Sequence, residues 1–282
     1  MWTRANKQHL AAVSLYLLKD EVKHLTLSSR FHRGGRRLWP SGQLVFVNLE
    51  QDYSVSGVVL ADSKGYLLTS FNPALKHDFT RVILAINYSI KVFCMIGQPE
   101  ELQFFYGFFY DNLSVVVDYT LMNYHIWQPL PRVTLKLNCK LLESTTSHYK
   151  ALLPLEEAFL REEVIIKNTK NTASIEKILS KYRKRLQNER MFHLVIDKKI
   201  VTKAGFTAEA YHYDMLGGVF TVTDYRRQGL STALVAAMQG NAKRRGKGVG
   251  LFVKNGNEAA LQLYYKNGFS KVGVLQVIYT NK

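Results

Sequence analysis

A short turn at residues 225–231 combines residue types that can bind an anion. The turn reads Tyr-Arg-Arg-Gln-Gly-Leu-Ser, follows an apolar strand-like run at 219–222 and precedes a helical pattern. A strand that turns into a helix leaves the first amide groups of the helix without partners, and the positive end of the helix dipole lies behind them. We therefore expect these amides to bind a pyrophosphate: those of Gln228, Gly229, Leu230, Ser231 and Thr232.

The helix after the turn must be fixed if its amides are to hold a ligand. Apolar side chains recur there at the spacing that anchors a helix to a sheet, at Leu230, Ala233, Leu234, Ala237 and Met238. Four cations follow this pattern, at Lys243, Arg244, Arg245 and Lys247. They either contact a nucleotide phosphate or form a solvated helix end, and their spacing does not decide between the two.

These residues carry a family resemblance. The turn at 225–231 resembles the R-x-x-G-x-G/A loop of the GNAT superfamily, the acetyl-CoA-dependent N-acyltransferases. Downstream residues resemble that family's second signature, N-x-x-A-x-x-L-Y-x-K-x-G-F, at Asn257, Ala260, Leu263, Tyr264, Lys266, Gly268 and Phe269. The whole chain is similar to bacterial predicted acetyltransferases that have an extra N-terminal region before the catalytic half.

The resemblance implies a fold, a reaction and a set of cofactor contacts. The fold is α+β, with a mixed, mostly antiparallel sheet flanked by helices. The reaction is transfer of an acetyl group from acetyl-CoA to a primary amine by direct attack. The implied cofactor residues are Val219, Phe220 and Thr221 for the pantetheine arm, the turn residues Arg226, Arg227, Gln228, Gly229, Leu230, Ser231 and Thr232, and Asn257, Tyr264 and Lys266 beyond them.

The resemblance also places Tyr264 at the position of the family's general acid, where its phenol can protonate the departing thiolate. The general base stays open among Glu163, Glu209, His212 and Asp214, because no spacing singles out one of them. Two departures from the family pattern concern the turn. Thr223 replaces a usual proline, and Ser231 replaces the final small residue.

Net charge is concentrated in the second part of the chain. Residues 1–145 hold 15 Lys and Arg against 11 Asp and Glu, a net +4, whereas residues 146–282 hold 23 against 11, a net +12. A polyanion, a phosphate-rich cofactor or an ordinary basic surface would each account for this charge. No RNA-binding signature accompanies it, so a nucleic-acid partner is not expected.

Composition limits the remaining classes of protein. At 282 residues and 47% apolar content, the chain can form one large or two ordinary domains. Cys94 and Cys139 are too few for a disulfide framework or a zinc site, so we expect buried structural thiols and no bound metal. No signal peptide and no run of about 20 apolar residues is found, and a cytoplasmic protein is expected.

The first part of the chain reads as a helix at 8–29, strands at 44–49, 57–61 and 66–71, and helices at 79–88 and 99–111. Strands at 91–96, 115–127 and 133–142 complete it. Its order of elements resembles a second, degenerate GNAT half without a phosphate loop. We therefore expect two domains in tandem, at 1–145 and 146–282. The second begins with helices near 154–161 and 174–189, followed by a hairpin at 192–196 and 200–210.

Three functions remain in view. An N-acetyltransferase acting on an amine of a small molecule or protein, as a monomer or homodimer, fits the resemblance throughout. A non-catalytic CoA-binding regulatory module would bind the cofactor at the same turn, and Tyr264 would not act as an acid. An acyltransferase acting on an RNA-bound substrate would use the basic surface, and salt would weaken its binding strongly.

Overall fold

The computed structural model describes residues 1–33, 36–109, 113–133, 138–164 and 175–280. The first half of the chain begins with β1 (Trp2–Arg4), η1 (Lys7–His9), α1 (Leu10–Leu18), α2 (Leu25–Ser28) and the small hairpin of β2 (His32–Arg33) and β3 (Arg36–Arg37). It continues with β4 (Leu44–Leu49), β5 (Val55–Ala61), β6 (Tyr66–Phe71), α3 (Thr80–Ser89), β7 (Cys94–Gly97), α4 (Pro99–Phe109) and β8 (Leu113–Tyr124).

The second half begins with β9 (Lys140–Glu143), η3 (Thr146–His148) and α5 (Tyr149–Phe159), which continues as a π-helical turn, η4 (Leu160–Val164). Next come α6 (Ile175–Leu179), α7 (Tyr182–Asn188), β10 (Arg190–Ile196), β11 (Lys199–Glu209), β12 (Tyr213–Thr221) and η5 (Thr223–Tyr225). The last elements are α8 (Leu230–Arg244), β13 (Gly248–Lys254), α9 (Glu258–Lys266) and β14 (Ser270–Thr280).

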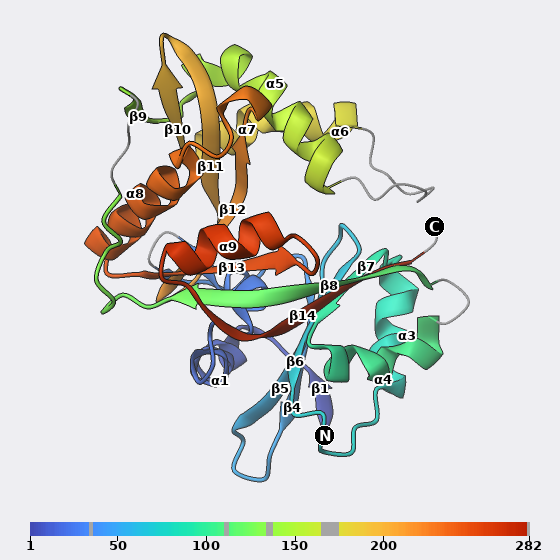
Figure 1. Cartoon of the computed structure of the whole chain (residues 1–282). Coiled ribbons are helices and arrows are strands. Elements are labelled where there is room, and N and C mark those ends of the chain that lie inside the picture. The colour runs from blue at the N-terminus through green and yellow to red at the C-terminus, as the bar shows by residue number, and fades with distance from the viewer. Residues whose placement is uncertain (34–35, 110–112, 134–137, 165–174, 281–282) are drawn as a thin grey trace.

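The two halves repeat one order of elements. Each runs from a first strand through two or three helices to a three-stranded meander, then helix, strand, helix and a long last strand. The meander is β4-β5-β6 in the first half and β10-β11-β12 in the second (Figure 1). In both halves the strand after the next helix pairs in parallel with the third meander strand, as β6–β7 and β12–β13. The chain is therefore an internal repeat of one mixed α+β unit.

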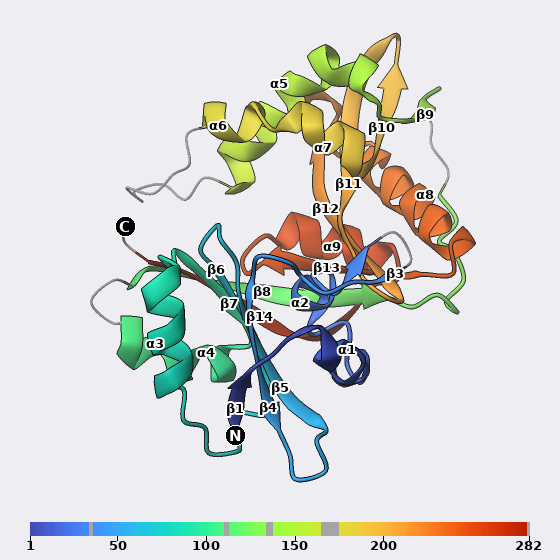
Figure 2. The same ribbon diagram turned by 180° about the vertical axis from the view of Figure 1, so that it is seen from behind.

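Twelve strands form a single sheet because the halves exchange their last strands. The order is β1-β4-β5-β6-β7-β14-β8-β13-β12-β11-β10-β9. Strand β14, from the end of the described chain, lies between β7 and β8 of the first half, and β8 lies between β14 and β13. Figures 1 and 2 show these two long strands running side by side across the middle of the molecule. Each half therefore completes its sheet with a strand of the other.

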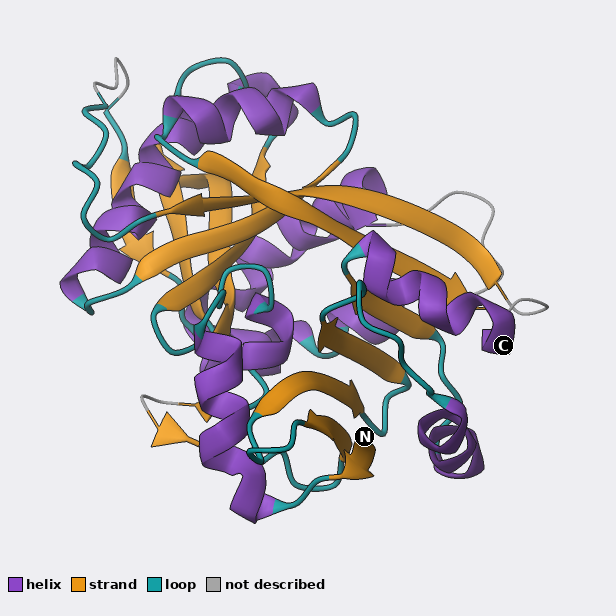
Figure 3. Ribbon diagram, turned by 90° about the horizontal axis from the view of Figure 1, so that it is seen from below, coloured by secondary structure: helices purple, strands orange, loops and turns teal. Residues whose placement is uncertain are grey.

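Helices cover both faces of the twisted sheet, as Figure 3 shows from below. In the second half α8 packs on one face, where Leu234, Val235 and Met238 join the core formed by Val249 and Leu251. Helices α5 and α7 lie on the opposite face. In the first half α3 and α4 belong to one apolar cluster, and α1 and α2 to another across the sheet.

The predicted fold class and most predicted strands are confirmed. The turn at Asp62–Gly65 joins β5 to β6, where Asp62 Oδ1 accepts hydrogen bonds from the amides of Lys64 and Tyr66, at 2.9 and 3.0 Å. Gly65 has a φ of +85°, a conformation that suits glycine. The hairpin of β10 and β11 also forms, with Asp197 and Lys198 at positive φ.

Several predicted elements differ from the structure. The single helix expected at 8–29 is broken between α1 and α2, and at this break the buried Glu21 accepts hydrogen bonds from the amide of His212 in the other half, at 3.1 and 3.0 Å. The helix expected at 174–189 is two helices, α6 and α7, and Ser174 lies outside the described residues. Of the strand expected at 133–142, only β9 is found, and residues 134–137 are not described. Cys94 is buried as expected, whereas Cys139 is half-buried and precedes β9.

Strand exchange predicts that the two halves unfold together. Ile278 in β14 is fully buried in the core of the first half, so Ile278→Ala should lower the free energy of unfolding by about 2–5 kcal/mol. Leu84→Ala is the control, because Leu84 is 65% exposed and its truncation should change stability by less than about 0.5 kcal/mol.

The measurement is urea unfolding followed by two signals. The three tryptophans, Trp2, Trp39 and Trp127, all lie in the first half, whereas far-UV circular dichroism reports both halves. We expect the two transitions to coincide and to shift together in Ile278→Ala. Two separate transitions, with only one moved by the substitution, would contradict the coupling.

Candidate functional site

Strands β12 and β13 separate part of the way along the sheet. They pair in parallel at Tyr213, Asp214 and Met215 of β12, opposite Gly248, Val249 and Gly250 of β13. Beyond Met215 the strands have no further pairing with each other, although β12 continues to Thr221 and β13 to Lys254. The two strands therefore separate beyond Met215, and the separation leaves ladder groups free for an extended ligand.

The turn after β12 presents unpaired amides at the beginning of α8. Gly229 is the N-cap residue with a φ of +78°, and Arg227 also has a positive φ, of +61°. The first backbone hydrogen bond at this end of the helix runs from the amide of Ala233 to the carbonyl of Gly229, at 3.0 Å. Across the described residues, the amides of Gln228 to Thr232 donate to no protein group. Five free donors at the positive end of a 15-residue helix are an arrangement suited to an anion.

Side chains hold this turn in place. Arg226 Nε donates to the carbonyl of Thr221 at 3.0 Å, and its guanidinium forms an ion pair with Glu162 at 2.7 Å. The hydroxyl groups of Thr221 and Ser231 lie 2.6 Å apart. Arg226 thus binds the protein itself, whereas Arg227 is exposed. Ser231, which departs from the family pattern, supplies a contact that a smaller residue would lack.

A cavity of about 890 Å³ lies along the separation and the turn. Its lining includes nearly all of the cofactor residues expected from the sequence: Val219, Phe220, Thr221, Arg226, Arg227, Gly229, Leu230, Ser231, Thr232, Asn257, Tyr264 and Lys266. Gln228 lies in the turn but not in the lining. Its side chain donates to the carbonyl of Asp224 at 3.2 Å.

Tyr264 and Glu163 line the same cavity. Tyr264 lies on α9 and is 7% exposed, and its hydroxyl forms no hydrogen bond with any described group. Burial raises the pKa of this phenol, and the charge of Glu163 raises it further. Glu163 accepts a hydrogen bond from Asn257 Nδ2 at 3.0 Å. The π-helical turn that ends α5 brings Glu163 to α9, which explains how residues a hundred positions apart meet.

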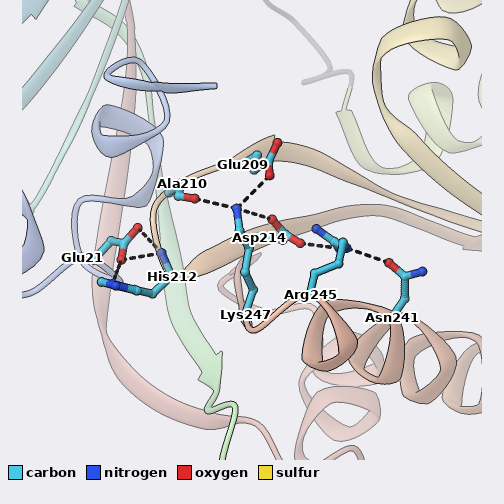
Figure 4. Close-up of polar contacts among 8 residues, drawn as sticks. All are labelled: Glu21, Glu209, Ala210, His212, Asp214, Asn241, Arg245 and Lys247. Atoms are coloured by element: carbon cyan, nitrogen blue, oxygen red, sulfur yellow. Dashed lines mark hydrogen bonds and ion pairs between the residues drawn. The ribbon is translucent and has the colours of Figure 1, made fainter. Parts of the chain in front are cut away.

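The other candidate bases lie elsewhere. Glu209, His212 and Asp214 gather at the paired end of β12, and each forms an ion pair (Figure 4). Lys247 Nζ lies 2.9 Å from Glu209 and 3.4 Å from Asp214, which also pairs with Arg245. His212 pairs with Glu21 at 3.1 Å. Burial favours a higher pKa for Glu209, but the hydrogen bond and charge of Lys247 outweigh it and lower that pKa.

A buried cation was missed by the sequence reading. Lys203 on β11 is 1% exposed and pairs with the equally buried Glu156 of α5 at 2.8 Å. Its Nζ donates to the carbonyl of Gly218 at 3.1 Å, where Gly218 has a φ of +63° in the irregular part of β12. Burial lowers the pKa of Lys203, and Glu156 opposes that effect. The sequence signal that could have indicated this buried cation is a lysine within a mostly apolar strand pattern.

The corresponding place in the first half is filled by a side chain. Strands β6 and β7 also stop pairing early, after Leu68 and Ile96. The buried carboxylate of Glu101 occupies the gap and accepts hydrogen bonds from Thr69 Oγ1 at 2.7 Å and from the amide of Phe71 at 3.3 Å. Residues 72–79, before α3, contain no glycine. The first half therefore keeps the fold, but the side chain of Glu101 fills the gap between its separated strands.

No group of three or more His, Cys, Asp or Glu among the described residues is arranged to hold a metal ion. Among the same residues, no helix is long and apolar enough to cross a membrane.

Comparisons with known proteins agree with this geometry. Residues 159–278 match the family model described as "Acetyltransferase (GNAT) domain". A search of curated proteins gave no match. Among solved structures, a GCN5-related N-acetyltransferase from Sphaerobacter thermophilus superposes with a TM-score of 0.56 at 15% identity, covering 99% of this chain and 94% of that one.

Two further structures cover nearly the whole chain. A tandem GNAT protein from the clavulanic acid biosynthesis pathway has a TM-score of 0.54 at 12% identity, with 99% and 98% of the two chains covered. A GNAT-family acetyltransferase from Colwellia psychrerythraea has a TM-score of 0.53 at 15% identity, with both chains fully covered. Residues 159–278 therefore form a GNAT acetyltransferase domain, and the chain as a whole has a tandem GNAT fold. The chain is an acyl-transferring enzyme.

The buried pair of Lys203 and Glu156 should be essential for stability. Lys203→Met removes one partner of a buried ion pair and should lower the free energy of unfolding by about 3–5 kcal/mol. Arg161→Met is the control, because the pair of Arg161 and Glu157 is 63% and 41% exposed and contributes less than about 1 kcal/mol. Urea unfolding measures both. Equal effects of the two substitutions would show that Lys203 is not held as described.

Proposed function

We propose that the chain is an N-acetyltransferase that transfers an acetyl group from acetyl-CoA to a primary amine of a small molecule or protein. The observation that carries this proposal is the continuous cavity that runs from the free amides of α8 along separated β12 to Tyr264. Direct attack in a ternary complex fits a site whose described lining residues include no cysteine and no histidine that could carry the acyl group.

The residues present fit coenzyme A. The five free amides at the beginning of α8 would bind the pyrophosphate, and the unpaired edge of β12 at Val219, Phe220 and Thr221 would pair with the pantetheine arm. Lys203 supports this edge, since it fixes the carbonyl of Gly218 from behind. Asn257 and Lys266 line the cavity beside Tyr264 on the other wall. When bound, acetyl-CoA supplies the acyl thioester.

Glu163 and Tyr264 would move the protons. The acceptor nitrogen forms its bond to the acyl carbon as the carbon–sulfur bond breaks, and Glu163 takes the proton that the nitrogen loses, directly or through water. The phenol of Tyr264 donates to the departing sulfur. Because burial raises its pKa, this phenol stays protonated at neutral pH and is a weaker acid than a thiol of pKa about 8.5. Complete transfer of this proton to a thiolate would be uphill, so the phenol would act as a hydrogen-bond donor that stabilises the negative charge developing on sulfur, and the released thiolate would take its proton from solvent.

Acetyl-CoA should stabilise the folded protein. At a concentration 100 times the dissociation constant, a ligand specific for the folded state adds about 2.7 kcal/mol. Gly229→Asp places a carboxylate among the five amides and should weaken acetyl-CoA binding at least tenfold. Gly246→Asp is a matched control, because Gly246 has a similar φ of +75° at the opposite end of α8.

The measurement is a thermal-shift titration with acetyl-CoA, with desulfo-CoA and free pantetheine as comparison ligands. Both aspartate variants should lose some intrinsic stability from backbone strain. Only Gly229→Asp should lose the shift caused by acetyl-CoA. Absence of any shift in the unmodified protein would refute the proposed cofactor.

Tyr264→Phe should lower kcat for acetyl transfer by about 10²–10⁴, the range typical of a lost general acid, while the dissociation constant of acetyl-CoA changes little. Tyr265→Phe is the control, since Tyr265 is the next residue on α9 and is 48% exposed. Thiol release with a panel of amines measures both variants. An unchanged rate in Tyr264→Phe would remove Tyr264 from the mechanism.

A further inference from the structure

A second cavity lies between the two halves of the chain. Its volume is about 420 Å³, which is within the size range of small-molecule sites. The first half contributes Thr26, Ser29, Arg30 and His32, around α2 and β2. The second half contributes the beginning of β10, the end of β11, the beginning of β12 and Arg245. Neither half encloses this space alone, and we refer to it as the interdomain cavity.

The interdomain cavity adjoins the proposed acetyl-CoA cavity. Thr207 and Met215 line both of them. Met215 is also the last residue of β12 that pairs with β13, so the common wall lies where the two strands begin to separate. Thr26 of the first half lies against this wall, with its Oγ1 4.0 Å from Met215 Sδ. A molecule in the interdomain cavity would thus meet the acetyl-CoA cavity at the wall of Thr207 and Met215, where the two strands begin to separate.

The charges that line the interdomain cavity are paired, with one exception. Glu209 and Asp214 are neutralised by Lys247 and Arg245, as Figure 4 shows. Arg30 pairs with the buried Asp62 at 3.3 Å. Glu189 forms an ion pair with Arg185 at 2.9 Å. Arg185 also pairs with Glu156, whose negative charge is neutralised by Lys203.

The exception is Arg190, the first residue of β10. Its side chain is exposed and forms no ion pair or hydrogen bond with the described residues, although its charge acts on Glu209 and contributes to the lowered pKa of that carboxyl group. A guanidinium without a partner at the edge of a polar cavity suits a carboxylate or a phosphate, which it can bind through two parallel hydrogen bonds. The cavity therefore carries one unmatched positive charge.

A second group in the interdomain cavity has one polar atom without a partner, although its ring also forms a hydrogen bond with the backbone of Glu209. His32 is 6% exposed, and its Nδ1 is buried without a hydrogen bond among the described residues. Burial and the nearby charge of Lys247 lower the pKa of His32, so the ring is neutral at physiological pH. A buried polar atom without a partner costs stability that a polar ligand would restore.

We infer that the interdomain cavity is the acceptor site, and that the acceptor is a small amine carrying one anionic group, which Arg190 binds. This inference rests on the proposed acetyl transfer. The amine of the acceptor would lie toward Thr207 and Met215, and its anionic group toward β10. The first half of the chain then has a function in the reaction, because it forms one wall of the acceptor site.

The test compares pairs of related amines, of which one carries an anionic group and the other does not. Glycine is paired with glycinamide, β-alanine with β-alaninamide, and O-phosphoethanolamine with ethanolamine, and thiol release from acetyl-CoA is measured for each. We expect at least one anionic amine to have a kcat/KM tenfold or more above that of its neutral partner. The carboxylate and phosphate pairs distinguish the two kinds of anion.

Arg190→Ala should remove this preference by raising the KM of the anionic amine at least tenfold, and it should leave the neutral partner and the acetyl-CoA thermal shift unchanged. Arg190→Lys should retain part of the preference. Arg183→Ala is the matched control, because Arg183 is an exposed arginine on α7 outside the cavity lining. A general structural defect would affect the neutral and anionic amines alike, so the difference between them isolates the contact.

Two results would overturn the inference while the proposed cofactor binding stands. One is an enzyme that is stabilised by acetyl-CoA but acetylates no anionic amine of the panel, or prefers the neutral partners. The other is a preference for anionic amines that survives in Arg190→Ala. Failure of acetyl-CoA to shift the melting temperature is a separate outcome, which refutes the proposed function itself.

Discussion

Pairing between β8 and β14 is the interaction on which the rest of the structure depends. These strands pair from Ser270 opposite Asn123 to Thr280 opposite Leu113, and each also pairs with a strand of the opposite half. Because α9 leads directly into β14, the position of Tyr264 relative to β12 is set by a sheet to which the first half contributes. If the two halves had separate sheets, the first half would not help to fix the position of α9 and Tyr264.

The two halves show how one fold can keep or lose a ligand site. In the second half, a glycine at positive φ and five free amides follow a strand that separates from its neighbour. In the first half the strands separate as well, but Glu101 satisfies the amide of Phe71 that a ligand would otherwise bind. Buried backbone groups require a partner in either case. The difference lies in whether that partner is a side chain or a bound molecule.

Sequence patterns predicted the site better than they predicted its surroundings. The turn at 225–231 and the residues from Asn257 to Phe269 are local in the chain, so their types and spacing carried the family resemblance, and nearly all of the cofactor residues that it implied line one cavity. The exchange of β8 and β14 between the halves could not be predicted from the sequence. The strands that pair are more than a hundred residues apart, and such pairing leaves no local pattern in the sequence. Glu163 could not be separated from Glu209 for the same reason. The break between α1 and α2 and the burial of Lys203 depend on contacts with the other end of the chain.

Strand exchange also has a consequence for biosynthesis. The first half has β7 and β8 ready once residue 124 is made, yet the strand between them is β14, at residues 270–280. During translation the facing edges of β7 and β8 therefore wait unpaired while some 150 further residues are added. Exposed strand edges favour pairing with other chains. The central part of the sheet can therefore be completed only after β14 has been synthesised.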